Sequence, residues 1–591
     1  MPLESFYIQQ VNSYSEKLQS IQRMILIVAI LRMVAFLAAG VSFYLYIRYS
    51  QILVAISAVV SILSFILLIR WSVGLNDKKV LFQKLVFINT NEKNILNDQA
   101  NKFDDGEQYL SEDGFGNDID VFGQASLYHL VNRTTTSHGS DQLAALLQAP
   151  LLDKPEIENY QEGIKILSQQ TVLRQLITAN GLMRGEKEGT LHDIGTWLNT
   201  PNKLQVAGWV NIARWFLPIL NIIALLYYWS SDNYIPMGLT ITGSWVCIGI
   251  FSKYISHQHA LLGKKQAILD QYASILKEFS TIREGSSSLL RNLQSDSLTA
   301  CSAIDKLSRL SGLLDQRMNL VVNIFLNSFL VYDIHCLFAL EKWKSINKQF
   351  FEKWIQCVGN IEALNSLATF AYNYPDYCQP VVLDQGLGLE CTSLAHPLIP
   401  AGERIANDLE LGKTGKLALV TGSNMSGKTT FLRTVGINLL LAQCGAPVCA
   451  TKFSFTPMQL LTAIRISDSL QLHTSYFMAE LKRLKNIIQH LQTGNPSLVL
   501  VDEILRGTNS DDKSHGSEEF IKKIISFNCL TLFATHDLSL SDLQNDFPGI
   551  VTNYCFESTI INAELSFDYK LQHGIAKNKN ASFLMKKMEI I

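Results

Sequence analysis

The chain has 591 residues, a length that accommodates roughly three or four domains, each large enough to bury its own core. Its 50 Lys and Arg residues nearly balance its 52 Asp and Glu residues, which excludes a protein that coats nucleic acid as a polycation but leaves room for a local basic groove. Hydrophobic residues form 48% of the chain and charged residues 17%, a ratio that directs attention to membrane segments.

The first element in chain order is a long apolar block, residues 24–69, within an N-terminal segment of residues 1–75. Residues 51–69 carry no charge, and about 20 apolar residues suffice to cross ~30 Å of hydrocarbon. Residues 24–47 contain Arg32, which costs about 2.5–3.5 kcal/mol at the centre of a membrane but is surrounded by Leu, Ile, Val and Phe. The block predicts a transmembrane hairpin with helices at residues 24–47 and 51–69.

A second apolar block follows at residues 206–256. Its first half contains Arg214, its second half carries no charge up to residue 252, and Ser230-Ser231-Asp232-Asn233 separates the two. Aromatic residues, which favour a membrane interface, stand beside this break: Tyr227, Tyr228, Trp229 and Tyr234. The block predicts a second transmembrane hairpin.

Two interpretations fit these blocks, namely hairpins inserted in a bilayer and helical hairpins buried in a large soluble core. The distribution of charge favours insertion. The two short connections carry only Arg48 and Asp232, whereas basic residues gather on the flanks: Lys17, Arg23, Arg70, Lys78, Lys79, Lys253, Lys264 and Lys265. By the positive-inside rule we expect a multi-pass protein of the inner or plasma membrane, with both termini and all remaining domains in the cytoplasm.

The remaining chain divides into a helical part and an α/β part. Residues 76–205 show helical periodicity, apart from an acidic, Gly-rich stretch at residues 104–118 that indicates a loop. Residues 257–380 predict long helices. In residues 381–591, short β-rich runs alternate with helices, which is typical of an α/β nucleotide-binding domain; the predicted strands are residues 416–421, 497–502, 530–535 and 553–557.

A glycine-rich loop in the α/β part carries the strongest chemical signal: Gly422-Ser423-Asn424-Met425-Ser426-Gly427-Lys428-Thr429, followed by Thr430. An apolar strand leads into it and a helix over residues 429–441 follows, so that backbone N–H groups point at phosphate oxygens. We expect Lys428 to reach the β- and γ-phosphates of ATP and the Thr429 hydroxyl to ligate Mg²⁺.

Two further strand ends supply candidate catalytic groups. The apolar strand 497–502 ends in Asp502-Glu503, where Asp502 is expected to hold Mg²⁺ and Glu503 to orient or deprotonate the attacking water. The strand 530–535 ends at Thr535-His536, a position from which His536 can sense the γ-phosphate.

Together these motifs resemble the ABC-type ATPase superfamily and, within it, the MutS family of DNA mismatch repair proteins. The phosphate loop with its Asn424-Met425 pair, and Asn407-Asp408 upstream of it, are similar to that family. So are the segments that look like its following helix, signature loop, and Walker B motif with D-loop: residues 441–448, residues 466–470 with 475–480, and residues 502–508. Outside the ATPase, residues 126–134, Gly139 and residues 151–154 resemble the start of the MutS core, and residues 257–375 its lever helices.

The resemblance implies a homodimer with composite ATP sites, in which Ser475 of one subunit contacts the γ-phosphate bound by the other. The chain also departs from the family. His473 stands where the signature loop usually has Gly, and the first hairpin occupies the place of the mismatch-reading domain. The second hairpin lies where the DNA clamp would emerge from the levers. The one Phe-x-Glu string, residues 350–352, falls inside the lever helices.

Three functions are therefore compared. The first is a membrane-attached, MutS-like ATPase that binds mismatched or branched DNA in a repair-type role. The second is an ATP-driven membrane switch without DNA binding, read by an unidentified protein partner. The third is a transporter, which four spans placed before and within lever helices do not resemble. The family resemblance favours the first.

Overall fold

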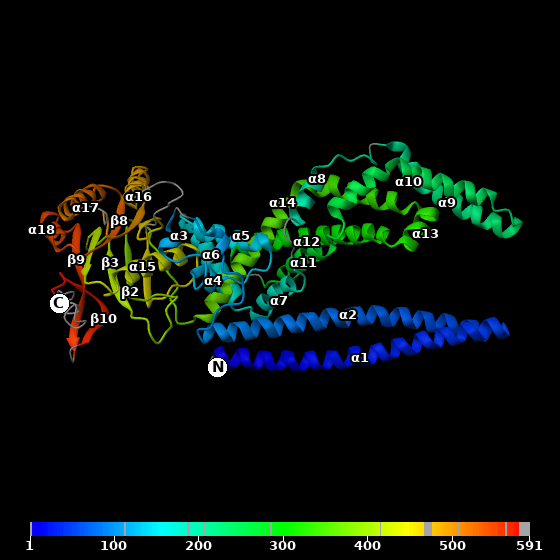
Figure 1. Cartoon of the computed structure of the whole chain (residues 1–591), viewed down its shortest axis with the longest axis horizontal. Coiled ribbons are helices and arrows are strands. Elements are labelled where there is room, and N and C mark those ends of the chain that lie inside the picture. Colours follow the sequence, from blue (N-terminus) through cyan, green and yellow to red (C-terminus); the bar gives the residue numbers. More distant parts are fainter. Residues whose placement is uncertain are drawn as a thin grey trace.

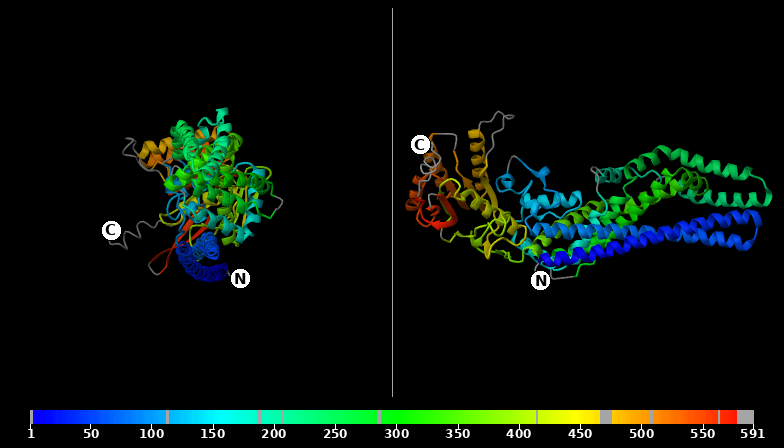
Figure 2. Two further views of the ribbon diagram at one scale, coloured as in Figure 1. Left: turned by 90° about the vertical axis from the view of Figure 1, so that its right-hand side faces the viewer. Right: turned by 60° about the horizontal axis from the view of Figure 1, so that its bottom comes forward.

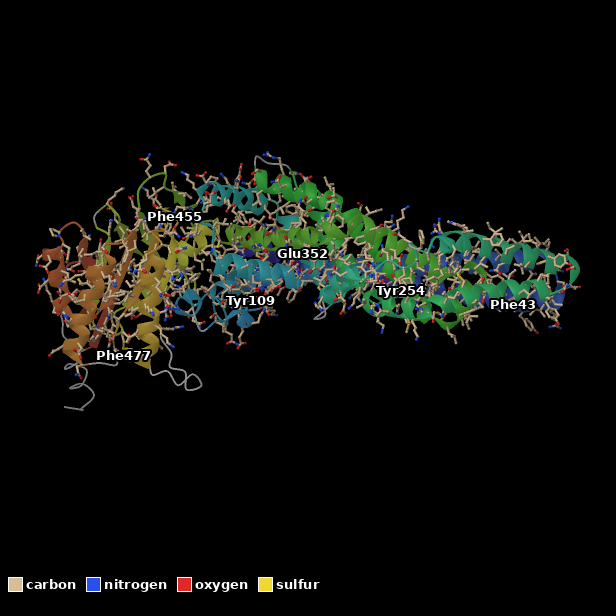
Figure 3. All side chains as sticks on the ribbon, turned by 90° about the horizontal axis from the view of Figure 1, so that it is seen from above. Phe43, Tyr109, Tyr254, Glu352, Phe455 and Phe477 are labelled. Carbon is tan, nitrogen blue, oxygen red and sulfur yellow. The ribbon has the colours of Figure 1, made fainter. Side chains whose placement is uncertain are left out.

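The computed structural model describes residues 3–111, 114–185, 190–205, 207–283, 287–413, 415–465, 476–505, 509–561 and 564–577. The molecule is elongated, with the α/β part at one end and two long helical hairpins pointing away from it (Figure 1). Figure 3 places Phe43 of the first hairpin and Phe477 of the α/β part near opposite ends of the long axis. The fold is thus multidomain, mostly helical, with mixed α/β sheets in the C-terminal part, as the sequence predicts in outline.

The first hairpin consists of α1 (Leu3–Tyr49) and α2 (Ile52–Leu96), two antiparallel helices that turn at Ser50 in the left-handed region. Both helices are longer than the apolar spans, and α2 continues well past residue 75. At the base of the hairpin, Tyr7, Leu85 and Ile88 are buried against the core. Most apolar side chains between residues 24 and 73 are exposed. The hairpin is therefore anchored at its base and apolar toward its tip.

The second hairpin consists of α9 (Gly208–Ser231) and α10 (Ile235–Leu262). Its tip points the same way as that of the first hairpin (Figures 1 and 2). Among the described residues, α1, α2, α9 and α10 are four helices long and apolar enough to cross a membrane, judged by length and composition. Whether they do so stays a prediction.

The helical core is built from short helices and long ones. The short helices are α4 (Leu127–Val131), α5 (Ser137–Gln148), α6 (Lys154–Ser168), α7 (Thr171–Leu182) and α8 (Thr190–Asn199). They are joined by α11 (Gln266–Phe279), the long helices α12 (Ser288–Asp315) and α14 (Tyr332–Asn373), and the 11-residue α13 (Leu320–Leu330) between α12 and α14. Side chains of Ser126, Thr136, Asp153 and Ser287 cap α4, α5, α6 and α12, which fixes where these helices begin.

The helix α14 connects the two ends of the core through buried carboxylates. Glu341 accepts hydrogen bonds from the backbone N–H groups of residues 203–205, just before the second hairpin. Glu362 accepts from the backbone and hydroxyl groups of Thr135 and Thr136. Because a buried carboxylate without partners is costly, these bonds hold the neighbouring segments in one register on α14.

A buried ion pair fastens the first hairpin to the C-terminal end of α14. Glu92 of α2 binds Arg133 at 2.5 Å, and both side chains are almost fully buried. Asn373, the last residue of α14, donates to Glu92 at 2.7 Å and accepts from the Tyr7 hydroxyl of α1 at 2.6 Å. The base of the hairpin and the end of α14 thus form one polar network.

The α/β part contains two sheets. The smaller has the order β1-β5-β2-β3, from β1 (Val381–Val382), β2 (Leu389–Leu394), β3 (Asn407–Leu411) and β5 (Lys452–Phe455). The larger has the order β10-β9-β4-β8-β7-β6, from β4 (Leu417–Gly422), β6 (Gln459–Ala463), β7 (Ser497–Asp502), β8 (Cys529–Thr535), β9 (Val551–Ile561) and β10 (Glu564–His573). Its strands are parallel except for β10, so the carboxyl ends of β4, β7 and β8 share one edge.

The larger sheet is covered on both faces. The helix α15 (Lys428–Gln443) packs on one face, and α16 (Tyr476–Leu491) and α17 (Ser510–Ile524) pack on the other. Burial on both sides explains why β4, β7 and β8 are continuous apolar runs, and why the sequence revealed them. All four predicted strands are confirmed, as β4, β7, β8 and β9.

We expect Glu92→Ala to lower the free energy of unfolding by about 3–5 kcal/mol, because it leaves the buried Arg133 without its counter-charge. The measurement is chemical unfolding of the full chain in mild detergent. Glu4→Ala is the control, since Glu4 accepts an exposed hydrogen bond from Asn97 and its loss should cost less than about 0.5 kcal/mol. Equal effects would show that the network does not fasten the hairpin.

Candidate active site

The phosphate loop lies where the sequence places it, between the end of β4 and the start of α15. Gly422 and Gly427 have φ angles of 156° and 101°, and a Cβ atom on Gly422 would lie 2.9 Å from the carbonyl oxygen of Phe556. Glycine is therefore required at both ends of the turn. The Ser426 side chain is 1% exposed, and its Oγ has no hydrogen-bond partner among the described residues. This buried donor fits an anion such as a phosphate group.

Lys428 is the first residue of α15, and its side chain folds back over the loop. Its Nζ donates to the carbonyl oxygens of Gly422 and Ser423, both at 3.0 Å. The loop carbonyl oxygens thus hold the ammonium group beside the expected phosphate position. From there the group can turn to phosphate oxygens.

The two predicted magnesium ligands lie side by side. Thr429 Oγ1 donates to Asp502 Oδ2 at 2.5 Å, which joins the start of α15 to the end of β7. No cluster of three or more His, Cys, Asp or Glu side chains in the described ranges could hold a metal by itself. The pair suits Mg²⁺, which takes few protein ligands and completes its shell with water and phosphate oxygens.

Glu503 and His536 face each other from neighbouring strand ends. His536 Nε2 lies 2.5 Å from Glu503 Oε1 and 3.2 Å from Lys428 Nζ. Burial, with help from the Lys428 charge, lowers the pKa of His536, so the imidazole is neutral at pH 7. The short contact with Glu503 requires the proton on Nε2, so we assign this tautomer, and the Lys428 contact is then a charge close by rather than a hydrogen bond. Glu503 has a φ of 48°, a strained conformation that aims its carboxylate out of the strand end.

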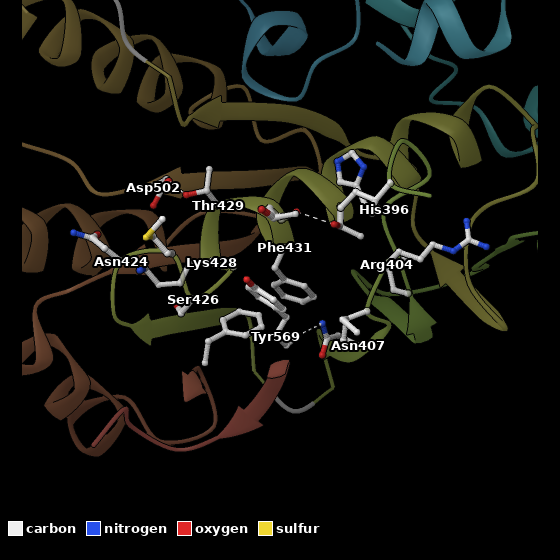
Figure 4. Close-up of a pocket in the computed structure, with 18 of the residues that line it drawn as sticks. His396, Arg404, Asn407, Asn424, Ser426, Lys428, Thr429, Phe431, Asp502 and Tyr569 are labelled. Carbon is white, nitrogen blue, oxygen red and sulfur yellow. Dashed lines mark hydrogen bonds between the residues drawn. The ribbon is translucent and has the colours of Figure 1, made fainter. Parts of the chain in front are cut away.

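These groups line one side of a cavity of about 680 Å³ (Figure 4). Phe431 and Tyr569 stand in the middle, and the far side is formed by polar and aliphatic residues of the smaller sheet and its loops: His396, Arg404, Ile405 and Asn407. Burial lowers the pKa of His396 to about 4, so this side chain is also neutral. The cavity therefore continues from the phosphate loop toward the smaller sheet, with space for a nucleoside.

Asn407 holds the wall of this cavity in place. Its Nδ2 donates to the carbonyl oxygen of Tyr569 at 3.0 Å, and its Oδ1 accepts from the Leu571 backbone N–H at 2.8 Å. The Tyr569 ring stands directly over Gly427, since a Cβ atom there would lie 3.1 Å from Tyr569 Cδ1. The sequence drew attention to Asn407 only through resemblance, and it gave no sign of Tyr569, which enters the site from a distant strand.

Acidic residues of the core reach the same domain, contrary to the expectation of a plain loop at residues 104–118. That stretch contains the short helices η1 (Glu107–Tyr109) and α3 (Phe115–Asp118). Asp118 is 1% exposed and accepts from Thr462 Oγ1 at 2.6 Å, beside the end of β6. Asp120 binds Arg465 at 2.6 Å and Arg433 of α15 at 3.1 Å. The core thus contacts both the phosphate-loop helix and the chain that leads toward residue 466.

The structure brings most of the predicted site together. Gly427, Lys428, Asp502, Glu503 and His536 line the cavity, as do Asn424, Met425, Ser426, Thr429 and Thr430. Ser475, His473, residues 466–470 and residues 506–508 lie outside the described residues. The sequence drew attention to Glu480 of α16 only as part of the segment that resembles the signature loop, residues 475–480. In the structure Glu480 is fully buried and accepts from the Leu505 backbone N–H at 2.7 Å, two residues after Glu503, a contact that the sequence did not predict.

A phosphate loop between a parallel strand and a helix, with acids at the next strand end, defines a P-loop ATPase domain. The family model for MutS domain V matches residues 418–588. The chain is also 34% identical over 232 residues to a DNA mismatch repair protein MutS of Clostridium botulinum, covering 38% of this chain and 24% of that one. It is 30% identical over 259 residues to the human MutS protein homolog 4, covering 42% of this chain and 25% of that one. Residues 418–588 therefore match MutS domain V, and the chain spans about a quarter of the length of these curated relatives.

We expect Asn407→Ala to weaken ATP binding about tenfold, because two hydrogen bonds that each contribute about 0.5–1.5 kcal/mol no longer hold Tyr569 over the phosphate loop. Equilibrium binding of a fluorescent ATP analogue measures this. Asp408→Ala is the matched control, because Asp408 is exposed on the same strand and accepts from the Ser393 backbone N–H, away from the cavity. Equal affinity in the two variants would remove Asn407 from the nucleotide site.

Proposed function

We propose that the chain is an ATPase that binds ATP and Mg²⁺ in the cavity at the phosphate loop. The observation that carries this proposal is the convergence of three strand ends, which places the Thr429–Asp502 pair, the Glu503–His536 pair and the buried Ser426 hydroxyl around one opening. Mg²⁺, when bound, neutralises charge on the β- and γ-phosphate oxygens.

The protein groups have separate tasks in this proposal. Lys428 leaves the loop carbonyls for the phosphates, and the loop N–H groups with Ser426 hold the phosphate oxygens. Glu503 orients the attacking water and takes up its proton, because its carboxylate faces the cavity and is fixed by neutral His536. His536, which also lies near Lys428, is placed to sense the γ-phosphate.

We also propose that the ATPase works as a homodimer in which Ser475 of a partner subunit completes each site. The support is the resemblance of the segment around Ser475 to the signature loop. The residues described in one chain line the cavity without enclosing it. An open cavity agrees with a site that a second subunit completes.

For Glu503→Gln we expect ATP affinity close to that of the parent and a loss of hydrolysis of about 10²–10⁴-fold, since the general base is removed but not the phosphate contacts. Phosphate release measures turnover, and light scattering measures whether ATP-bound dimers accumulate. Glu519→Gln on the surface of α17 is the control. Parental hydrolysis would exclude Glu503 as the catalytic group, and a monomer under ATP would refute the composite site.

Membrane attachment through both hairpins is part of the proposal. Its support is the wide exposure of apolar side chains on both, such as Leu53 at 74% and Leu226 at 66%, which in water would be an aggregation hazard. The two hairpins extend in one direction, away from the ATPase, so one bilayer can receive both (Figures 1 and 2). The core and the ATPase would then lie on the cytoplasmic side.

For the role of the ATPase we propose a DNA-responsive function of the repair type, on mismatched or branched DNA. The support is the similarity of the ATPase domain to its relatives, two of which are named DNA mismatch repair protein MutS. The alternative is an ATP-driven membrane switch without DNA binding, read by another protein. One observation favours it: α14 joins the chain beside the ATPase to the region of the second hairpin without interruption.

Salt-dependent DNA binding separates these two roles. If the DNA role is right, the full chain in lipid nanodiscs binds duplex or branched DNA, and its affinity falls steadily as salt rises, because Lys and Arg displace counter-ions from phosphates. Fluorescence anisotropy with labelled DNA over a range of salt concentrations measures this, with empty nanodiscs as the control. Absence of binding at low salt, in a preparation that still hydrolyses ATP, would leave the membrane switch.

A further inference from the structure

The sequence predicts long helices over residues 257–380, and between the long helices α12 and α14 the structure inserts the short helix α13. This 11-residue helix follows α12 and meets α14 at an angle of 83°. One of its faces is strongly apolar and exposed: Leu320 at 71%, Val321 at 76%, Ile324 at 50% and Phe325 at 62%. Such a face on a short surface helix needs a partner.

The other face of α13 packs against both helices of the second hairpin. Asn327 and Ser328 on this face are almost fully buried. The indole N–H of Trp245 in α10 donates to Ser328 Oγ at 3.0 Å. The exposed face of α13 is therefore continuous with the exposed apolar surfaces of α9 and α10.

Asn221 of α9 closes the end of α13. Its Nδ2 donates to the carbonyl oxygens of Ser328 and Phe329, at 3.0 and 3.2 Å, and to Ser244 Oγ of α10 at 3.0 Å. Both carbonyls belong to the last turn of α13, where a helix has no internal donors to offer. The following turn is satisfied as well, because Asn327 Oδ1 accepts from the Asp333 backbone N–H at 2.9 Å.

The hairpin determines how far from its tip the contact between Asn221 and α13 lies. At a rise of 1.5 Å per residue, Asn221 and Ser244 each lie roughly 15 Å along their helices from the turn between α9 and α10. That is about half of a ~30 Å hydrocarbon layer. The exposed Trp229 and Tyr234 at the turn, and Trp209 at the opposite end of α9, stand where aromatic residues mark the two interfaces.

We propose that α13 is a re-entrant membrane segment, which enters the bilayer beside the second hairpin and ends near its middle. The occupant of its apolar face is lipid acyl chains. Broken helices are tolerated at that depth only where protein groups form hydrogen bonds with the freed backbone groups. Asn221 donates such hydrogen bonds to the end of α13. The inference rests on the proposed membrane attachment. It gives α14 a start inside the bilayer, so the lever that ends beside the ATPase is itself anchored in lipid.

Photo-crosslinking of the full chain in phospholipid vesicles tests the proposal. A photoreactive phenylalanine analogue replaces one of four exposed phenylalanines in turn: Phe325 on α13, Phe216 on α9, Phe43 on α1 and Phe350 on α14. Mass spectrometry then counts lipid adducts. We expect the yield at Phe325 to lie within about twofold of that at Phe216, because both face one hydrocarbon layer. Phe350 stands roughly 30 Å along α14 from its start, outside the layer, and should give few adducts.

Each outcome decides a separate point. Adducts at Phe43 and Phe216 but not at Phe325 would overturn the inference and leave membrane attachment intact. Absence of adducts at Phe43 and Phe216 would overturn membrane attachment itself. Crosslinks from Phe325 to a second copy of the chain would show that protein rather than lipid covers α13, which also refutes the proposal.

A second variant tests the role of Asn221. In Asn221→Ala the last turn of α13 loses its donors, and we expect the lipid adducts at Phe325 to fall several-fold while those at Phe216 persist, because the hairpin still inserts. Asn211→Ala, an exposed asparagine on the same helix, is the control and should change neither yield. An unchanged Phe325 yield in Asn221→Ala would exclude Asn221 as the group that holds α13.

Discussion

The arrangement of this molecule depends on the burial of carboxylates along one helix. Glu341 and Glu362 of α14, and Glu92 against the end of α14, are each surrounded by donors from a different segment of the chain. A buried carboxylate that loses its partners is far more costly than an exposed one, so each segment is held at a single position on α14. Apolar packing alone would allow small shifts along the helix. The polar contacts therefore fix the positions of both hairpins and of the core along α14.

The helix α14 ends at Asn373, shortly before the α/β part that carries the candidate nucleotide site. Around the end of α14, the aromatic rings of Phe370, Tyr374 and Tyr377 pack together, and the chain then enters the smaller sheet at β1. The core also touches the ATPase through Asp118 and Asp120, whose partners include Arg433 on the phosphate-loop helix. A change in the phosphate loop can thus reach the core along two routes, one through α15 and one through the smaller sheet.

The sequence predicted the parts of the structure that depend on local patterns. The strands β4, β7 and β8 are buried on both faces, so they are continuous apolar runs, and the acids and His536 directly follow them. For that reason the residues expected to contact the phosphates could be predicted from the sequence. Tyr569 and the contact between Glu480 and Leu505 were not predicted, because β10 and α16 reach the site only through tertiary packing. The break at α13 was also missed, since an apolar run continues across it and only Asn221, about a hundred residues away, reveals where the backbone turns.

Geometry sets what α14 can transmit. A helix of 42 residues is about 63 Å long, so a tilt of roughly 5° at its ATPase end moves the other end by about 5 Å. If that other end lies in a bilayer beside α9 and α10, lipid and protein packing oppose the movement, and the tilt is shared with the first hairpin through Glu92 and Asn373. A ligand shifts such an equilibrium only by its difference in affinity between the two arrangements. Under the proposed function, the closing of the ATP site would supply the free energy that repacks the membrane end, and by the same linkage a membrane that favours one arrangement would change the affinity for ATP.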